Sequence, residues 1–157
     1  MGHYLRDIIY GATDGVVTTV AVIAGAAGAS FEPRVGIILG LANLGADGLS
    51  MGASNYLGLK SELEQVGASV DAEQPWRHGL ATTLAFMLAG ALPLLSYVFV
   101  ELSRGLQLLM ALAIAAVVLA CVGAARAVFV RGSALRCAIE VLLVAGGASA
   151  CAYLLGL

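Results

Sequence analysis

Charged side chains are scarce in this chain of 157 residues. Asp, Glu, Lys and Arg together make up 11% of it, whereas 61% of the residues are hydrophobic and the mean hydropathy is +0.96. The surface of a soluble domain needs more polar groups than this composition supplies, which excludes a soluble protein. The net charge of -2 gives no basis for nucleic-acid binding. We therefore interpret the chain as an integral membrane protein.

Cysteine is also rare, and its placement excludes a disulfide framework. The chain has three cysteines and no Cys-x-x-Cys pair, and all three lie in or beside apolar runs: Cys121, Cys137 and Cys151. We interpret them as small apolar side chains that pack in the interior rather than as metal ligands.

Five apolar runs are long enough to cross the roughly 30 Å of hydrocarbon, which takes about 20 helical residues. They cover residues 8–29, 35–59, 79–100, 106–125 and 134–157, and the third and fourth carry no charge. The first run is too long for the core of a signal peptide and contains Asp14, so we expect it to be retained. The sequence predicts an all-α polytopic membrane protein, a single domain over residues 1–157 with five transmembrane helices.

The Lys and Arg distribution predicts the topology. One side of the membrane would hold Arg6, Lys60, Arg77, Arg126, Arg131 and Arg136, and the other only Arg34 and Arg104. The positive-inside rule then places the N terminus and the link 60–77 in the cytosol. Short outer links make spans one and two, and spans three and four, antiparallel neighbours. We expect the second helix to continue to Gln65 before Gly67 breaks it.

Glycines recur at helical spacing. The chain has 20, and three pairs lie four residues apart: Gly11 and Gly15, Gly36 and Gly40, Gly48 and Gly52. In a membrane this spacing lets helices approach closely through their backbones. We therefore expect spans one and two to pack against protein rather than lipid.

Two acidic residues stand alone inside apolar runs, Asp14 in the first and Asp47 in the second. A carboxylate at bilayer depth costs several kcal/mol unless it meets a partner, a proton or a cation. Residues four apart share a helix face, so Asn43, Asp47 and Met51 form one stripe, and Asp7 and Asp14 lie nearly eclipsed over two turns. Both faces carry metal-ligand atoms.

Helix rise places Asp14 roughly 10 Å and Met51 roughly 12 Å from the cytosolic ends of their spans, with Asp47 about 6 Å further in. The sequence therefore predicts a ladder from Asp7, through Asp14 level with Met51, to Asp47. Carboxylate with thioether suits Fe²⁺ better than Mg²⁺ or Ca²⁺, and Mn²⁺, Co²⁺ and Zn²⁺ are also compatible. The alternative is that Met51 only fills space and the acids only bond neighbouring helices.

Three further features are assigned structural roles. Glu140 lies four residues after Arg136, so we favour an ion pair between them over a proton-carrying role. His78 is expected at the cytosolic interface as a solvated or anchoring side chain. The segment Gly48 to Gly52 fits the Gly-x-Ser-x-Gly pattern of a serine nucleophile, but that motif needs a strand-to-helix turn and a histidine base. We therefore predict no enzymatic activity.

The chain resembles the vacuolar iron transporters and the related nodulin-like metal transporters over nearly its whole length. The segment from Arg6 to Gly15 (RDIIYGATDG) is similar to the family's first-span signature, and Gly48 to Gly52 (GLSMG) with Tyr56 and Lys60 to Glu62 is similar to its second. Pro75, Phe86 with Gly90, and Pro93 resemble the third span, and residues 132–156 the last.

The resemblance implies a homodimer of five-helix protomers in the lipid bilayer that exchanges cytosolic Fe²⁺ for protons. It implies that Asp14 and Met51 form the transport site and that Asp7 is the acid at the cytosolic mouth. Asn43 falls where plant members have a glutamate, and Asp47 on the same face is a candidate to replace it. Protons would then bind Asp14 and Asp47, with Glu140 as a further candidate.

Iron-transporting members insert a glutamate-rich cytosolic domain after the second span, whereas this chain has only the link 60–77, like the nodulin-like branch. We expect Glu62 and Glu64 to help load metal, and no tightly bound cofactor besides the transported ion. A prokaryotic cytoplasmic membrane is favoured over a vacuolar one. The alternative from another class is a non-transporting scaffold or metal-sensing subunit whose buried acids only pack helices.

Overall fold

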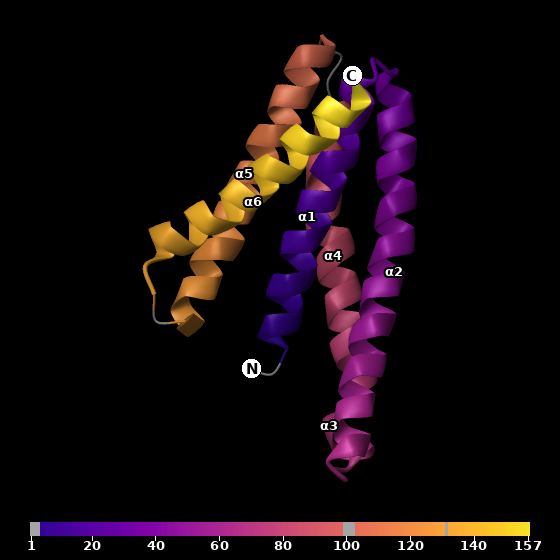
Figure 1. Ribbon diagram of the computed structural model, residues 1–157, viewed down its shortest axis with the longest axis vertical. Helices are drawn as coiled ribbons and strands as arrows, with labels where there is room; N and C mark the ends of the chain where they lie inside the picture. Colours follow the sequence, from indigo (N-terminus) through magenta and orange to yellow (C-terminus); the bar gives the residue numbers. More distant parts are fainter. Residues whose placement is uncertain (1–3, 99–102, 131) are drawn as a thin grey trace.

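The computed structural model describes residues 4–98, 103–130 and 132–157, and it is helical throughout (Figure 1). The helices are α1 (Leu5–Gly28), α2 (Pro33–Gln65), α3 (Val70–Glu73), α4 (Pro75–Val98), α5 (Arg104–Val130) and α6 (Ala134–Gly156). All except the short α3 are long and apolar enough to cross a membrane. The predicted all-α, five-span architecture is thereby confirmed, and no strand occurs among the described residues.

The helices extend beyond the predicted spans at several ends. Helix α4 begins at Pro75, four residues before the expected start, because proline is well suited to the first turn of a helix. Residues 99–102, in the expected third span and outer link, and Arg131, one of the expected cytosolic charges, lie outside the described residues.

Left-handed residues end three of the helices: Ser30 ends α1, Gly67 follows α2 and Gln74 ends α3. Ser30 (φ 57°) ends α1, where the Phe31 amide donates to the Ala26 carbonyl at 3.0 Å, and Pro33 then starts α2. Gly67 (φ 67°) stops α2 as predicted, with the Ala68 amide bonded to the Leu63 carbonyl at 2.9 Å. Between these turns α2 runs for 33 residues, about 50 Å, so its last turns project beyond the other helices together with α3 (Figure 1).

Helix α4 is the centre of one half of the bundle. It packs extensively against both α1 and α2, while α6 packs against α1 and α5. The predicted neighbours α1 with α2 and α4 with α5 also touch, but over smaller areas. Glycines explain the difference: a Cβ added to Gly11 would lie 2.5 Å from the Thr82 carbonyl oxygen, and one added to Gly52 would lie 2.6 Å from that of Gly79. The close helix approach predicted from glycine spacing is therefore confirmed at these positions, with α4 as the partner.

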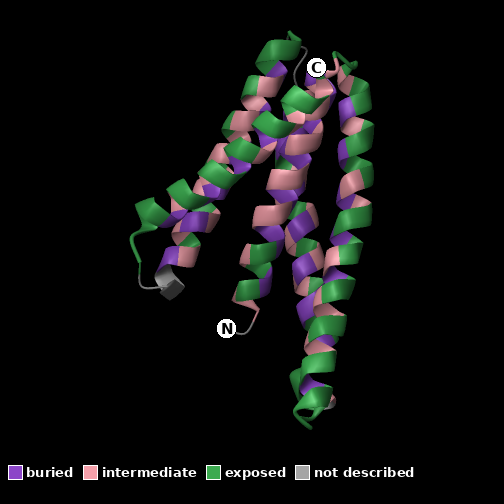
Figure 2. Cartoon of the chain, viewed as in Figure 1, coloured by how far each residue is buried: buried purple, intermediate pink, exposed green. Residues whose placement is uncertain are grey.

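Burial separates α1 from α2 (Figure 2). Helix α1 contributes large side chains to the core, including Val16, Val20 and Ile23, whereas α2 buries chiefly glycines, Leu44 and Leu63. Leucines 41, 49 and 57 on the remaining face of α2 are more than half exposed. The prediction that both helices pack against protein therefore holds for α1, and for α2 only along one face.

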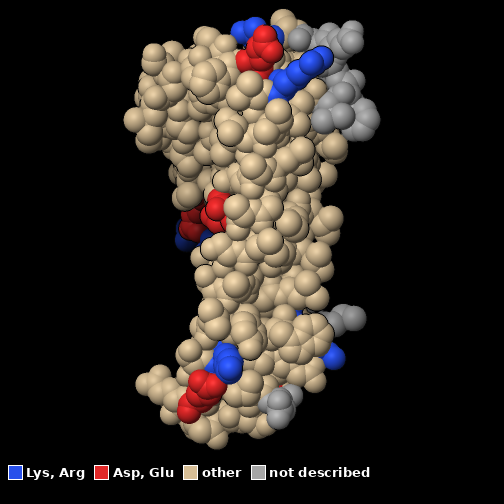
Figure 3. Space-filling model, turned by 90° about the vertical axis from the view of Figure 1, so that its right-hand side faces the viewer, with Lys and Arg blue, Asp and Glu red and all other residues tan. Residues whose placement is uncertain are grey.

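Charged side chains lie mainly towards the two ends of the molecule (Figure 3). On the face drawn there, Lys, Arg, Asp and Glu gather near both ends, and a small charged cluster at one edge interrupts the uncharged band between them. This distribution is typical of a protein whose middle lies in hydrocarbon.

Candidate functional site

The two intramembrane acids, Asp14 and Asp47, interact electrostatically. Asp14 is half-buried on α1, where burial affects its carboxyl group most, and Asp47, exposed on α2, contributes a further charge repulsion. Two carboxylates at this depth repel each other, and a shared cation or a proton relieves the repulsion. The partner that the structure gives Asp14 is thus the second intramembrane acid.

The other two members of the α2 stripe are partly buried. Met51 packs against the core cluster around Phe86 and Leu44, which is the packing role that the alternative interpretation expects. The side-chain nitrogen of Asn43 is buried and has no hydrogen-bond partner among the described residues. Asn43 lies one helical turn before Asp47, so this part of α2 carries an unsatisfied hydrogen-bond donor that a polar neighbour would stabilise.

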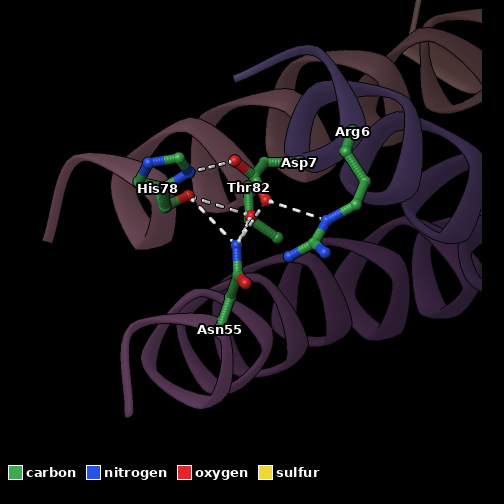
Figure 4. A network of polar contacts seen from close by, with 5 residues as sticks. All are labelled: Arg6, Asp7, Asn55, His78 and Thr82. Carbon is green, nitrogen blue, oxygen red and sulfur yellow. Dashed lines mark hydrogen bonds and ion pairs between the residues drawn. The ribbon is translucent and has the colours of Figure 1, made fainter. Parts of the chain in front are cut away.

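Asp7 has a different environment from the other acids, because it is only 2% exposed and fully engaged within the protein. One oxygen, Oδ2, lies 2.6 Å from His78 Nδ1, and the other, Oδ1, accepts from Asn55 Nδ2 at 2.9 Å (Figure 4). The exposed Arg6 guanidinium is 3.9 Å from Oδ1. Asp7 was predicted as the acid at the cytosolic mouth of the metal path; in this arrangement its carboxylate is buried and both of its oxygens are already bonded to protein groups.

The network around Asp7 joins three helices. Asn55 on α2 also donates to Thr82 Oγ1 at 2.7 Å, and the Thr82 hydroxyl on α4 donates to the His78 carbonyl at 3.0 Å. Tyr4 lies beside the imidazole of His78, with ring centroids 4.6 Å apart. The network therefore joins the first turns of α1 and α4 to α2 at a point ten residues before the end of α2.

Of the two roles expected for His78, solvated or anchoring, the solvated one is wrong. His78 is 7% exposed, because α4 begins at Pro75 and this first turn already packs against α1. The sequence did carry signals for the network: Asn55 continues the stripe of Asn43, Asp47 and Met51 by one more turn, and His78 and Thr82 lie four apart. Amide and hydroxyl side chains at helical spacing are common in helices, so this spacing alone does not indicate a site.

Glu140 forms an ion pair, although with a different arginine from the one predicted. Its Oε2 lies 3.2 Å from the Arg126 guanidinium of α5, where the i, i+4 spacing had suggested Arg136. The two helices pack side by side, so a cross-helix partner is available to the carboxylate. Both groups are partly exposed, and the pair joins α5 to α6.

The acids of the cytosolic link have separate surroundings. Glu64 is paired with Lys60 at 3.8 Å along the helix. Glu62 instead borders a cavity of about 380 Å³ that is also lined by Arg6, Glu73 and His78. Of the two predicted loading residues, Glu62 thus borders an open cavity, whereas Glu64 is engaged by Lys60.

The described part of one protomer holds no complete metal cluster. Among the described residues, no three His, Cys, Asp or Glu side chains come together in a group able to hold a metal ion. The predicted ladder is therefore divided: Asp7 belongs to the helix network, while Asp14 and Asp47 interact two turns away.

A model of the VIT family matches residues 5–74 and 64–157, which together cover almost the whole chain. The chain belongs to the VIT family. Vacuolar iron transporter homolog 5 from Oryza sativa subsp. japonica is 30% identical to this VIT-family chain, and the alignment covers 99% of the chain and 79% of the relative.

Two further relatives match a little less than half of this chain. Vacuolar iron transporter 1 from Arabidopsis thaliana is 36% identical over 73 residues, which is 46% of this chain and 29% of the relative. The vacuolar iron transporter of Plasmodium berghei is 35% identical over 71 residues, 45% of this chain and 26% of the relative. This VIT-family chain thus matches less than a third of the length of these two proteins.

Proposed function

We propose that this protein exports Fe²⁺, or a similar divalent metal such as Mn²⁺, Co²⁺ or Zn²⁺, from the cytosol in exchange for protons. The observation that carries the proposal is the interaction of Asp14 with Asp47, two carboxyl groups from antiparallel helices at bilayer depth. Family membership and the names of the relatives, which are vacuolar iron transporters, support a metal as cargo.

The chemistry follows from competition for the same oxygens. A ligating carboxylate must be ionised, so metal and proton exclude each other at Asp14 and Asp47. Neutral cytosol favours metal loading, and acid on the far side favours release. Met51, one helical turn from Asp47, adds a soft thioether that selects a transition metal over Ca²⁺ or Mg²⁺.

A second copy of the chain completes the site in this proposal. One protomer leaves Asp47 exposed at a depth where lipid would otherwise cover it. Exposing this carboxylate to hydrocarbon is costly, and a homodimer that covers this face of α2 removes the cost. It also supplies further oxygens to an ion that two carboxylates alone coordinate incompletely.

The same proposal orients the protein with its N terminus in the cytosol, because the ends near Arg6, Lys60 and Arg77 carry more positive charge than the ends near Arg34 and Arg104. Short links and abundant alanine and glycine favour a prokaryotic cytoplasmic membrane over a vacuolar one. Glu62, which faces the cytosolic cavity, is placed to collect metal ions there.

The competing function is a scaffold whose buried acids only join helices, and the geometry of Asp7 favours that role for this one residue. The test uses purified protein reconstituted in liposomes with an acidic interior. Asp14→Asn keeps the shape of the side chain and removes its charge, so we expect proton-driven Fe²⁺ flux to fall at least tenfold while thermal stability stays within a few degrees. Glu32→Gln, an exposed acid at the start of α2, is the matched control and should retain flux. Undiminished flux in Asp14→Asn would refute the transport assignment.

A further inference from the structure

We infer that Asn55 and His78 are positioning residues for the metal site: by holding Asp7, they fix the register of α1 against α2 and so set how Asp14 faces Asp47 and Met51. The inference rests on the proposed function for its transport readout. Its structural part rests on the hydrogen-bond network alone.

The register argument starts from helix rise. Asp14 is seven residues, about 10 Å, beyond Asp7 along α1, and Asp47 is eight residues, about 12 Å, before Asn55 along the antiparallel α2. The Asp7–Asn55 contact at 2.9 Å and the Asp14–Asp47 interaction therefore lie at matching heights on the same helix pair. A slip of one residue would shift α2 by about 1.5 Å and turn its face by about 100°. Asp47 would then point away from Asp14.

The network is well suited to resist such a slip. The Asn55 amide has two N–H groups, and they are directed to Asp7 Oδ1 and Thr82 Oγ1. An ionised carboxylate only accepts, so the imidazole donates to Asp7 Oδ2 through Nδ1. If any one partner is lost, a buried charge or donor remains unsatisfied, which costs more than an average hydrogen bond contributes.

Helix α4 makes the arrangement a three-way joint (Figure 4). His78 and Thr82 lie on one face of α4, and the same helix meets α2 where a Cβ on Gly79 would lie 2.5 Å from the Gly52 carbonyl oxygen. One turn further along, the Thr83 hydroxyl donates to the Gly48 carbonyl at 3.0 Å. Contacts with α4 on one side and with Asp7 on the other therefore both constrain the register of α2, next to the turn that carries Met51.

An exchange of donor and acceptor tests the inference. Asn55→Asp is isosteric but places a second carboxylate against Asp7, so we expect KM for Fe²⁺ to rise at least fivefold and the melting temperature in detergent to fall. The double variant Asp7→Asn with Asn55→Asp restores one donor facing one acceptor, and the new amide on α1 still offers its oxygen to His78. It should return KM to within twofold of the unsubstituted protein. Gln65→Glu, which makes the same exchange of amide for carboxylate at the exposed end of α2 outside the apolar run, is the matched control and should leave KM unchanged.

His78 provides an independent arm. His78→Asn keeps an N–H donor near the position of Nδ1, whereas His78→Leu removes it. We expect His78→Leu to raise KM as Asn55→Asp does, and His78→Asn to stay within twofold of the unsubstituted protein. Loss of packing alone would impair both variants to a similar degree, which would overturn the positioning role of His78.

Two results would overturn the inference as a whole: an unchanged KM in Asn55→Asp, or a double variant that transports as poorly as the single one. If Asp7 were itself a metal ligand, moving its carboxylate to α2 would not rescue KM. A protein that transports no metal at all would contradict the proposed function. The melting temperatures would then decide the register role, since only a hydrogen-bond pair between Asp7 and Asn55 predicts recovery in the double variant.

Discussion

The contact between α1 and α4 at Gly15 predicts a defined loss of stability. An added Cβ would lie 2.9 Å from both Cα and the carbonyl carbon of Phe86, whereas carbon atoms normally pack at about 3.5 to 4.0 Å. Gly15→Ala therefore forces the helices roughly 1 Å apart, and a gap of that size forfeits a quarter to a half of each dispersion contact. Overpacking of this kind typically costs about 1 to 3 kcal/mol.

A second glycine supplies the control. Gly147 on α6 is exposed, and a Cβ there meets no atom within 4 Å. Both substitutions gain the same helix propensity, so the difference between Gly15→Ala and Gly147→Ala isolates the packing cost. Denaturant titration in mild detergent measures that difference, which we expect to be about 1 to 3 kcal/mol. Metal flux should also fall in Gly15→Ala because Asp14 is the adjacent residue. Equal stability of the two variants would refute the close approach of α1 to α4.

The remaining predictions concern the other acids. Glu140→Gln removes the ion pair with Arg126, and because both groups are partly exposed it should change the free energy of unfolding by less than about 1 kcal/mol. The dependence of flux on pH should stay the same in this variant; a displaced pH profile would show that Glu140 carries protons. Glu62→Gln should raise KM for cytosolic metal about two- to fivefold, in line with the loss of one exposed charge at a cavity. Glu64→Gln, whose carboxylate is already paired with Lys60, should not, and equal effects of the two would refute the role of the cavity.

The fold could be predicted from the sequence because its strongest signals are local. Five apolar runs and the need to satisfy every backbone group in lipid leave little besides helices of known length. Gly67 could likewise be identified as the end of α2, since a left-handed residue is a local requirement. Ser30, which takes the same conformation at the end of α1, carried no comparable signal.

The site could be predicted only in part, because helix faces follow from spacing but helix pairing does not. The spacing placed Asp7 and Asp14 on one face of α1, and it placed Asp47 and Met51 on one face of α2. Which side chains meet depends on how α4 packs against α1 and α2. The glycines of α4 do not indicate which helix each of them contacts. For that reason Asp7 was assigned to a metal path although His78, 71 residues away in sequence, encloses it. The same limitation led to Arg136 rather than Arg126 as the partner of Glu140.

The unbroken course of α2 makes it a lever. The hydrogen bonds of Asn55 hold α2 at a point between Asp47 inside the bilayer and Gln65 outside it, so α2 would pivot there if it tilted. The arm from Asn55 to Gln65 is about 15 Å long, so a tilt of about 10° moves its tip by roughly 2.6 Å. A fluorescent label attached at Gln65 can detect a displacement of that size. A label on Gln65 would therefore detect from the aqueous phase any tilt of α2 that accompanies metal binding at the intramembrane carboxylates.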